Sequence, residues 1–171
     1  MSLAKKTAFC SIMCALSVVI LSLGSVIEII DITSAALASF IVAVCMIELR
    51  SYFPVLLYFA TSVLAFLLLP NKTVAFMYIM FFGFYPILKK YLERLRPILS
   101  WIAKFIVFNI IIFIYVTVAG NMFFPDANNT KMYLAILLNI VFFTLDFALT
   151  VFVTAYVRKL RRVLQLHKFF K

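Results

Sequence analysis

Asp146 has the clearest chemical potential in this chain, because it is an acid in the middle of a long apolar run. On a helix, Asn139, Thr150 and Thr154 fall on its face, and Asn109 of the preceding apolar run lies at a comparable depth. One interpretation is a hydrogen-bonded lock between Asp146 and Asn109 that holds two helices in register. The other is a site for a proton, an ion or a ligand, the default hypothesis for an acid inside a membrane. Because we expect no basic residue level with Asp146, a ligand site is favoured over a proton relay.

A second set of polar residues stands at the ends of apolar runs. Two acids and a threonine follow the first run, an asparagine follows the third, and another lies late in the fifth. One interpretation is a row of solvated loop residues; the other is the mouth of a pocket with an aromatic wall. With the intramembrane residues added, the predicted substrate-binding set is Glu28, Asp31, Thr33, Asn71, Tyr78, Asn121, Asn139 and Asp146.

Enzyme chemistry is hard to place on this chain. The sequence contains no nucleophile elbow, no zinc-protease motif, no phosphate-binding glycine loop and no close pair of intramembrane carboxylates. Its one histidine, His167, and its three cysteines inside apolar runs give no metal-ligand cluster. We therefore expect no enzymatic activity, no metal and no cofactor.

The composition identifies the class of protein that must position these residues. Of 171 residues, 67% are hydrophobic and 13% are charged, and the mean hydropathy is +1.17. A soluble domain is usually about 45–50% apolar and about 25% charged, and one small core cannot hide this much apolar surface. Disorder is excluded as well, because it requires low hydrophobicity. The composition predicts an all-α, multi-pass protein of the cell membrane.

Six apolar runs are candidates for transmembrane helices. A helix needs roughly 20 apolar residues to cross a hydrocarbon core of about 30 Å, and turn residues such as Pro70 and Asn71 break the pattern between runs. We expect one integral membrane domain over residues 1–171, with a basic cytoplasmic tail at 158–171. The predicted spans are residues 8–30, 32–47, 52–69, 73–88, 101–124 and 132–157.

The basic residues give this arrangement an orientation. If both termini are cytoplasmic, fourteen Lys and Arg residues fall on the inner side and only Lys72 and Lys131 on the outer side, which is the positive-inside bias. The net charge of +10 then reflects contact with anionic lipid head groups and not binding to nucleic acid. Residues 89–96 are predicted to extend the fourth helix along the membrane surface, with Glu93 within reach of Lys89 and Lys90.

The first predicted helix carries a stripe of small residues at helical spacing. Such spacing lets another helix approach closely. The stripe serves either for packing inside the bundle or for docking a separate membrane protein, and its members are Ser11, Ala15, Val18, Ser22 and Ser25. Beside it runs a second set of residues, Cys10, Cys14, Ser17, Gly24 and Glu28.

With six predicted helices, a basic N-terminus and this first helix, the chain resembles the substrate-binding S components of energy-coupling factor vitamin transporters. The segment from Lys5 to Leu16 is similar to the family's Ala-x-x-x-Ala docking motif, with Ser11 and Ala15 as the small pair and Ile12 where alanine would follow Ala8. The resemblance implies a small-molecule substrate bound near the outer face by the loop after helix one and by helices four to six. It also implies docking through Ser11 and Ala15 on a transmembrane coupling subunit, with ATP hydrolysed by separate ATPase subunits.

Two other functions stay open. One is a non-transporting membrane scaffold or assembly protein, which would have a filled interior. The other is an ion-coupled or proton-coupled carrier centred on Asp146, which would need a path to this residue from both faces.

Overall fold

Almost every described residue of this chain lies in a helix. A computed structural model describes residues 3–49, 52–93, 96–123 and 128–160, and these contain no strand. The chain divides into two compact units, one formed by Met1–Leu88 with Leu149–Lys171 and the other by Lys89–Ala148. We call them unit 1 and unit 2.

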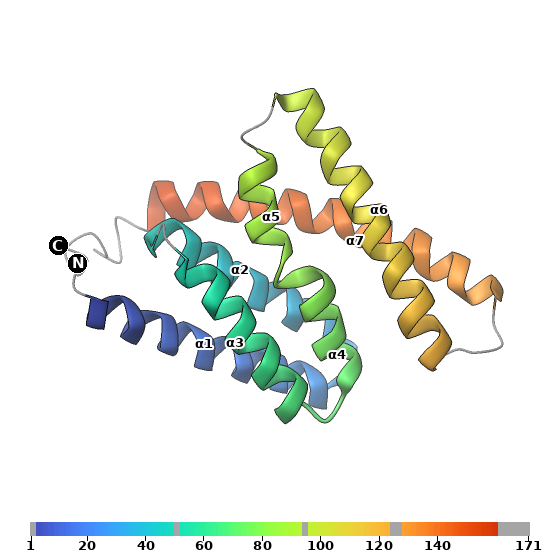
Figure 1. Cartoon of the computed structure of the whole chain (residues 1–171), viewed down its shortest axis with the longest axis horizontal. Coiled ribbons are helices and arrows are strands. Elements are labelled where there is room, and N and C mark those ends of the chain that lie inside the picture. Colours follow the sequence, from blue (N-terminus) through green and yellow to red (C-terminus); the bar gives the residue numbers. More distant parts are fainter. Residues whose placement is uncertain (1–2, 50–51, 94–95, 124–127, 161–171) are drawn as a thin grey trace. The chain divides into compact units, whose positions relative to one another are not determined.

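Most of the described residues lie in seven α-helices (Figure 1). A 3-10 turn, η1, and two short π-helices, η2 and η3, complete the described elements. In chain order they are α1 Leu3–Val26, η1 Glu28–Ile30, α2 Asp31–Leu49, α3 Phe53–Leu68, α4 Lys72–Met77, η2 Tyr78–Phe82, α5 Tyr85–Leu92, α6 Pro97–Phe123, α7 Asn128–Ala155 and η3 Tyr156–Leu160.

Three helices of the described chain are long and apolar enough to cross a membrane. They are Leu3–Val26, Asp31–Leu49 and Ile136–Arg158, and they fall on the first, second and sixth predicted spans. The segments Phe53–Leu68 and Ile98–Ile114 form shorter apolar helices. The described residues thus confirm the prediction of an all-helical protein with several apolar helices that suit a membrane.

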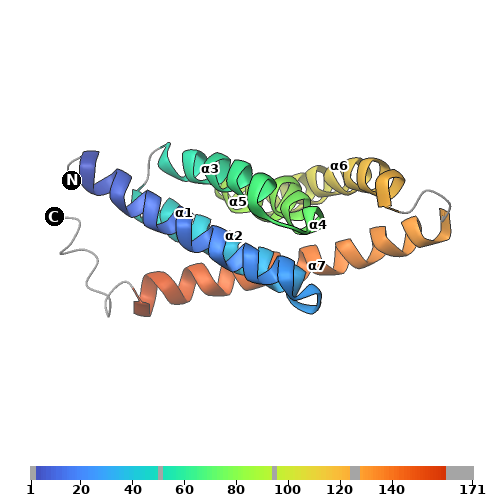
Figure 2. The same cartoon turned by 90° about the horizontal axis from the view of Figure 1, so that it is seen from below.

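In unit 1, α1, α2 and α3 pack side by side (Figure 2). Gly24 permits this approach near the end of α1, since a Cβ there would lie 1.9 Å from Ser34 Oγ and 2.5 Å from Ser34 Cβ. Small residues on a helix face allow close packing of this kind. The buried face of α1 consists of Cys10, Cys14, Ser17, Leu21, Gly24 and Ser25.

The stripe that α1 uses for packing is therefore displaced by one residue from the predicted small-residue stripe. Ser11 and Ala15 are exposed, and Val18 and Ser22 are half-buried, so only Ser25 of the predicted set is buried. Both stripes repeat with steps of four and three, and a displacement of one residue rotates the face by about 100°. The prediction that Ser11 and Ala15 pack inside the bundle is not met within unit 1.

The fourth predicted span is not one regular helix. It consists of α4, the π-helix η2, a turn at Gly83 and then α5. The Tyr58 hydroxyl donates to the Ile79 carbonyl at 2.8 Å, which pairs a backbone group inside the π-helix. A Cβ at Gly83 would come within 2.7 Å of the Tyr58 ring and 2.8 Å of the Tyr78 ring, so the turn requires glycine.

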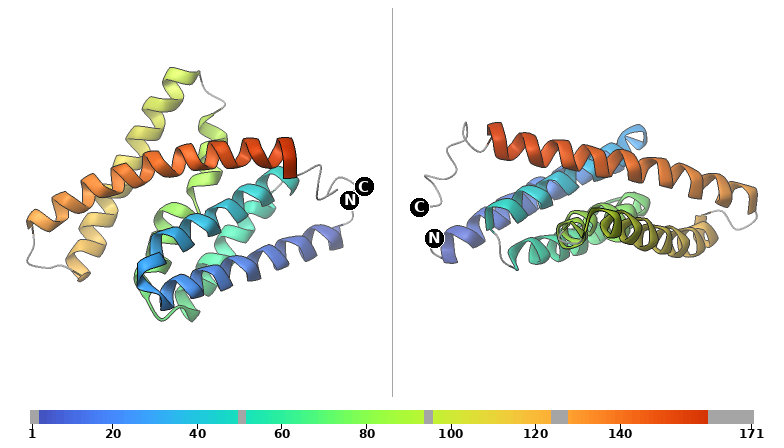
Figure 3. Two further views of the ribbon diagram at one scale, coloured as in Figure 1. Left: turned by 180° about the vertical axis from the view of Figure 1, so that it is seen from behind. Right: turned by 90° about the horizontal axis from the view of Figure 1, so that it is seen from above.

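The last turns of α7 belong to unit 1 and lie beside α2 (Figure 3). The rings of Phe40 and Phe152 stack with centroids 4.6 Å apart. One turn further on, the Tyr156 hydroxyl donates to Glu48 Oε1 at 3.2 Å. An aromatic stack from α7 and a hydrogen bond from Tyr156, the first residue of η3, thus hold the end of α7 and the start of η3 on α2.

In unit 2, α6 packs on the first part of α7 through large aromatic side chains. Phe108 and Phe142 stack with ring centroids 4.0 Å apart, and both are buried. Trp101 and Phe143 form a second stack at 6.4 Å, closer to the start of α6. These contacts set the register between the two helices and thereby place the charged groups described next.

Candidate functional site

Asp146 is the centre of a buried ionic cluster in unit 2. Its side chain is 6% exposed. Lys89 of α5 donates to the Asp146 Oδ1 atom at 2.5 Å and to the Asp146 carbonyl at 2.6 Å. Lys104 of α6 donates to the same Oδ1 atom at 3.2 Å. One carboxylate thus receives ammonium groups from two other helices.

Glu93 adds a second carboxylate to this cluster. Its Oε1 atom lies 3.6 Å from Lys89 Nζ and 3.3 Å from Lys104 Nζ. The predicted contact between Lys89 and Glu93, four residues apart, is therefore confirmed. Glu93 is 48% exposed, whereas both lysines and Asp146 are buried. The four side chains carry two positive and two negative charges, and we call Lys89, Glu93, Lys104 and Asp146 the ionic cluster.

The ionic cluster joins α5, α6 and α7 at one point. Lys89 lies in the last two turns of α5, Lys104 in the second turn of α6, and Asp146 in the second half of α7. Buried charges are tolerated only when they are paired and hydrogen-bonded. Removing one partner of such a pair typically costs about 3–5 kcal/mol, because the remaining charge stays buried. The cluster therefore makes the association of three helices depend on side-chain identity.

Two predictions about Asp146 are wrong. Asn109 is not its partner, because the Asn109 amide donates to the Phe105 carbonyl of its own helix at 2.9 Å. The expectation of no basic residue at this depth is also wrong, since Lys89 and Lys104 both contact Asp146. The broader expectation, that Asp146 meets a polar group of the fifth predicted span, is met by Lys104.

The predicted topology places Lys104 among the cytoplasmic charges and gives it no role at Asp146. A signal for it existed in the sequence, since Lys104 lies inside the apolar run 101–124 and a lysine there needs a partner. Lys89 was assigned to the membrane surface, but its side chain is 8% exposed. No sequence pattern shows that Lys89, and not Lys90, is the buried lysine, because the sequence of α5 alone does not show which side of this helix meets α7.

The chemistry open to the ionic cluster is that of paired charges. Asp146 already accepts from two ammonium groups, and Lys89 already has a carbonyl and two carboxylate acceptors. A lone acid that takes up and releases a proton is thus not what the structure presents. The arrangement favours a register-fixing contact that would bring α5, α6 and α7 together in one way.

Unit 1 contains a second polar site, where α1 ends and α2 begins. The Asn71 side-chain amide donates to Asp31 Oδ2 at 3.5 Å, and Asn71 Oδ1 accepts from the Thr73 backbone N–H at 2.9 Å. Asn71 is therefore the N-cap of α4 as well as the neighbour of Asp31. Two predicted substrate-binding residues, 40 positions apart in sequence, are together here, and we call Asp31 and Asn71 the polar pair.

The other predicted substrate-binding residues do not form a common site among the described contacts. Thr33 is exposed, and its hydroxyl donates to the Ile30 carbonyl at 2.8 Å. Tyr78 is fully buried in unit 1, where its ring lies 6.3 Å from the Tyr58 ring. Asn139 is half-buried on α7 in unit 2. The side chains of Glu28 and Asn121 lie outside the described residues.

Three surface grooves formed by described residues are apolar. One runs along α3, one lies between α1, α2 and the last turns of α7 in unit 1, and one lies between α6 and α7 in unit 2. None of the eight predicted substrate-binding residues lines these three grooves. They match hydrocarbon better than a polar solute.

Comparison with known proteins adds no relative. No protein-family model, no curated protein and no solved structure matches this chain.

Proposed function

We propose that this chain is the substrate-binding subunit of a micronutrient uptake transporter in the cell membrane. It crosses the membrane six times with both termini in the cytoplasm. It captures a small molecule near the outer face and docks on a transmembrane coupling subunit, which works with separate ATPase subunits.

The observation that carries this proposal is the division of α1 into two faces of small residues. One face packs against α2 and α3, and the adjacent face leaves Ser11 and Ala15 exposed. Internal packing of unit 1 does not account for the exposed face, whose short side chains would let the backbone of another helix approach. A membrane-embedded partner is the natural occupant of such a face.

The polar pair supports the other half of the proposal, which is ligand capture. Asp31 and Asn71 lie at the end of unit 1 where α1 stops, whereas Ser11 and Ala15 lie near the middle of α1, closer to its N-terminus than the polar pair is. If the N-terminus is cytoplasmic, the polar pair is at the outer face and the docking face is toward the cytoplasm. A substrate with hydroxyl or amide groups would suit the carboxylate and the amide.

The docking surface is tested by two matched substitutions on exposed positions of unit 1. Ala15→Trp places a large ring on the small-residue face, and Leu67→Trp places the same ring on α3, where Leu67 is 68% exposed. Tagged protein purified from native membranes should bring with it an ATP-hydrolysing complex. We expect Ala15→Trp to lose this activity at normal expression and Leu67→Trp to keep it. Equal recovery for both variants, or uptake by the purified chain alone in liposomes, would refute the proposal.

The membrane topology is tested separately. Single cysteines at Asn128 and Gln165, in a background without the native cysteines, should react with membrane-impermeant thiol reagents from opposite sides. Labelling of both from one side would contradict six spans with cytoplasmic termini.

A membrane scaffold is the second candidate, because the charges of the ionic cluster are already paired and the three described grooves are apolar. Such a protein would bind partners but no small molecule. Protection of the fold by an extracted metabolite fraction, seen as a rise in the Tm, would favour the transporter subunit over the scaffold. The carrier centred on Asp146 fits less well, because Lys89 and Lys104 neutralise this acid.

A further inference from the structure

Asp146 lies in the middle of the segment of α7 that is long and apolar enough to cross a membrane. This segment is Ile136–Arg158, so Asp146 stands ten residues from its start and twelve from its end. One aspartate at the centre of an apolar helix opposes membrane insertion about as strongly as six leucines favour it. The short side chain does not reach either interface from this depth. Inserted alone, the segment would carry an uncompensated carboxylate into the hydrocarbon.

The groups that neutralise Asp146 all come earlier in the chain. Lys89 and Lys104 both contact its carboxylate. The two ammonium groups also lie 3.6 and 3.3 Å from Glu93 Oε1. During synthesis both lysines are therefore made before Asp146. Until Asp146 follows them into the membrane, Glu93 supplies an acidic partner.

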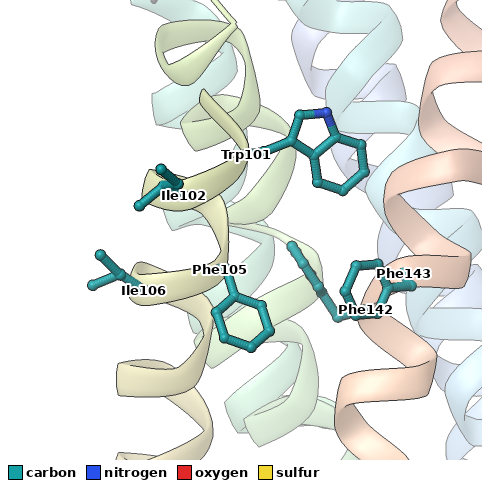
Figure 4. A pocket seen from close by; sticks show the side chains of 6 residues that line it. All are labelled: Trp101, Ile102, Phe105, Ile106, Phe142 and Phe143. Carbon is teal, nitrogen blue, oxygen red and sulfur yellow. The ribbon is translucent and has the colours of Figure 1, made fainter. Parts of the chain in front are cut away.

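The helices α6 and α7 are neighbours in sequence and in space. Only residues 124–127 separate them along the chain. Figure 4 shows Trp101 and Phe105 reaching from α6 toward the side of Phe142 and Phe143 on α7. When α7 leaves the ribosome, the helix that presents the lysine of the fifth span is therefore the one directly before it.

We infer that the ionic cluster acts while the chain enters the membrane. Lys89 and Lys104 are already in place, they neutralise Asp146, and they thereby let the sixth span insert. Insertion of this span then depends on side chains of the two spans before it. The inference rests on the six-span topology of the proposed function, but it requires neither a substrate nor a coupling subunit.

A cluster that only stabilises the finished fold leads to a different expectation. In that case the spans insert independently and pair afterwards, so the topology does not depend on the two lysines. The location of the C-terminus distinguishes the two cases. Six spans return it to the cytoplasm, whereas loss of the sixth span leaves it on the outer side.

The experiment uses the full chain with a reporter fused after Lys171, expressed in a bacterial host. Green fluorescent protein reports a cytoplasmic C-terminus, and alkaline phosphatase reports an outer one. In Lys89→Met with Lys104→Met, we expect the ratio of cytoplasmic to outer C-termini to fall by about a hundredfold, the effect of one uncompensated central aspartate. Adding Asp146→Leu to these two substitutions should restore the cytoplasmic location. Neither readout requires the helices to pack correctly after insertion.

The matched control is Lys90→Met with Arg96→Met. It removes two of the fourteen predicted cytoplasmic charges, as the test variant does, and so weakens the positive-inside bias equally. We expect its C-terminus to stay in the cytoplasm.

A two-lysine variant whose C-terminus stays in the cytoplasm would overturn the inference, because Asp146 would then insert without a partner. A control that loses the cytoplasmic location as far as the two-lysine variant does would also overturn it. In both cases the six-span topology of the wild type would stand. An outer C-terminus in the wild type, in contrast, would overturn both the inference and the topology of the proposed function.

Discussion

Units 1 and 2 bring their helices together in opposite ways. In unit 1, the buried faces of α1 and α2 are rich in small residues and carry no charge, and Gly24 lies directly against Ser34. In unit 2, helices α5, α6 and α7 meet through large rings and through a buried ionic cluster. The first arrangement depends on shape, and the second depends on charge.

The polar groups of the two units follow the same division. Serine hydroxyls in α1 and α2 donate to carbonyls of their own helices, as Ser17 does to Met13 at 2.9 Å and Ser39 does to Ala36 at 2.6 Å. Such bonds satisfy the hydroxyl without requiring a particular partner helix. Lys89 and Lys104, in contrast, share Asp146 of α7 as a buried carboxylate acceptor. We therefore expect added bulk to be the damaging change at the interface of α1 and α2, and loss of a charge to be the damaging change at the ionic cluster.

The largest effect is expected from Asp146→Leu. This change leaves two buried lysines with only the half-exposed Glu93 as a carboxylate, so we expect a loss of about 3–5 kcal/mol in the free energy of unfolding. Asp146→Asn should be nearly as severe, because a neutral amide does not balance either ammonium. Reversible unfolding in mixed detergent micelles measures both.

A compensating variant separates charge from packing. In Asp146→Leu combined with Lys89→Met, the remaining charged pair is Lys104 with Glu93, 3.3 Å apart. We expect the double variant to recover most of the stability that Asp146→Leu loses. A double variant no more stable than the single one would show that the ionic cluster is not what holds α5 to α7.

The corresponding change in unit 1 is Gly24→Ala. The added methyl group would overlap the Ser34 side chain, whose Oγ and Cβ lie 1.9 and 2.5 Å from its position. Overpacking of this kind typically costs about 1–3 kcal/mol, less than the loss of Asp146. If Gly24→Ala is the more damaging of the two, the contrast between shape and charge is reversed.

Ser34→Gly supplies the control for this prediction through a double-mutant cycle. Ser34→Gly alone loses a hydroxyl that donates to the Asp31 carbonyl at 2.8 Å. Combined with Gly24→Ala it removes both overlapping atoms, so the cycle should give a coupling energy that favours the double variant. A coupling energy near zero would mean that α1 and α2 adjust to the extra methyl group elsewhere.

The positions of the helices, and the small-residue packing in unit 1, were predicted better from the sequence than the charge contacts of unit 2. Apolar runs and turn residues located the helices, because burial of backbone groups in an apolar run leaves few alternatives to helix. The small-residue character of α1 was also predicted correctly, but within unit 1 the neighbouring stripe, and not the stripe of Ser11 and Ala15, is the one that packs. Two adjacent stripes have the same spacing and similar residues, so α1 alone does not reveal which one α2 will contact.

The ionic cluster was predictable only in part. Asp146 stood out because an acid in an apolar run is conspicuous, but its partners come from positions 42 and 57 residues away. The predicted pairing of Asn109 with Asp146 requires that the two residues lie at matching depth, whereas the observed partner, Lys104, lies five residues earlier on α6. The break in the fourth span depends on contacts of Gly83 with Tyr58 and Tyr78, which only the fold brings together.

The smallest effect is expected at the polar pair, where two substitutions of Asn71 separate its two contacts. Asn71→Ala removes the cap of α4 and the contact to Asp31, and loss of such a cap costs about 1 kcal/mol. Asn71→Asp keeps an oxygen that accepts from the Thr73 N–H. It also replaces the side-chain amide nitrogen, which lies 3.5 Å from Asp31 Oδ2, by a second carboxylate oxygen.

If Asn71 acts mainly as a helix cap, Asn71→Asp should be close to wild type in stability and Asn71→Ala should not. If the amide is needed to balance Asp31, both variants should lose about 1 kcal/mol, and acidification that protonates one carboxylate should restore Asn71→Asp but not Asn71→Ala. Thermal unfolding in detergent at two pH values decides between these outcomes. Recovery of Asn71→Asp at low pH would show that charge also matters in unit 1, and the contrast between the units would then hold for their packing interfaces but not for the polar pair.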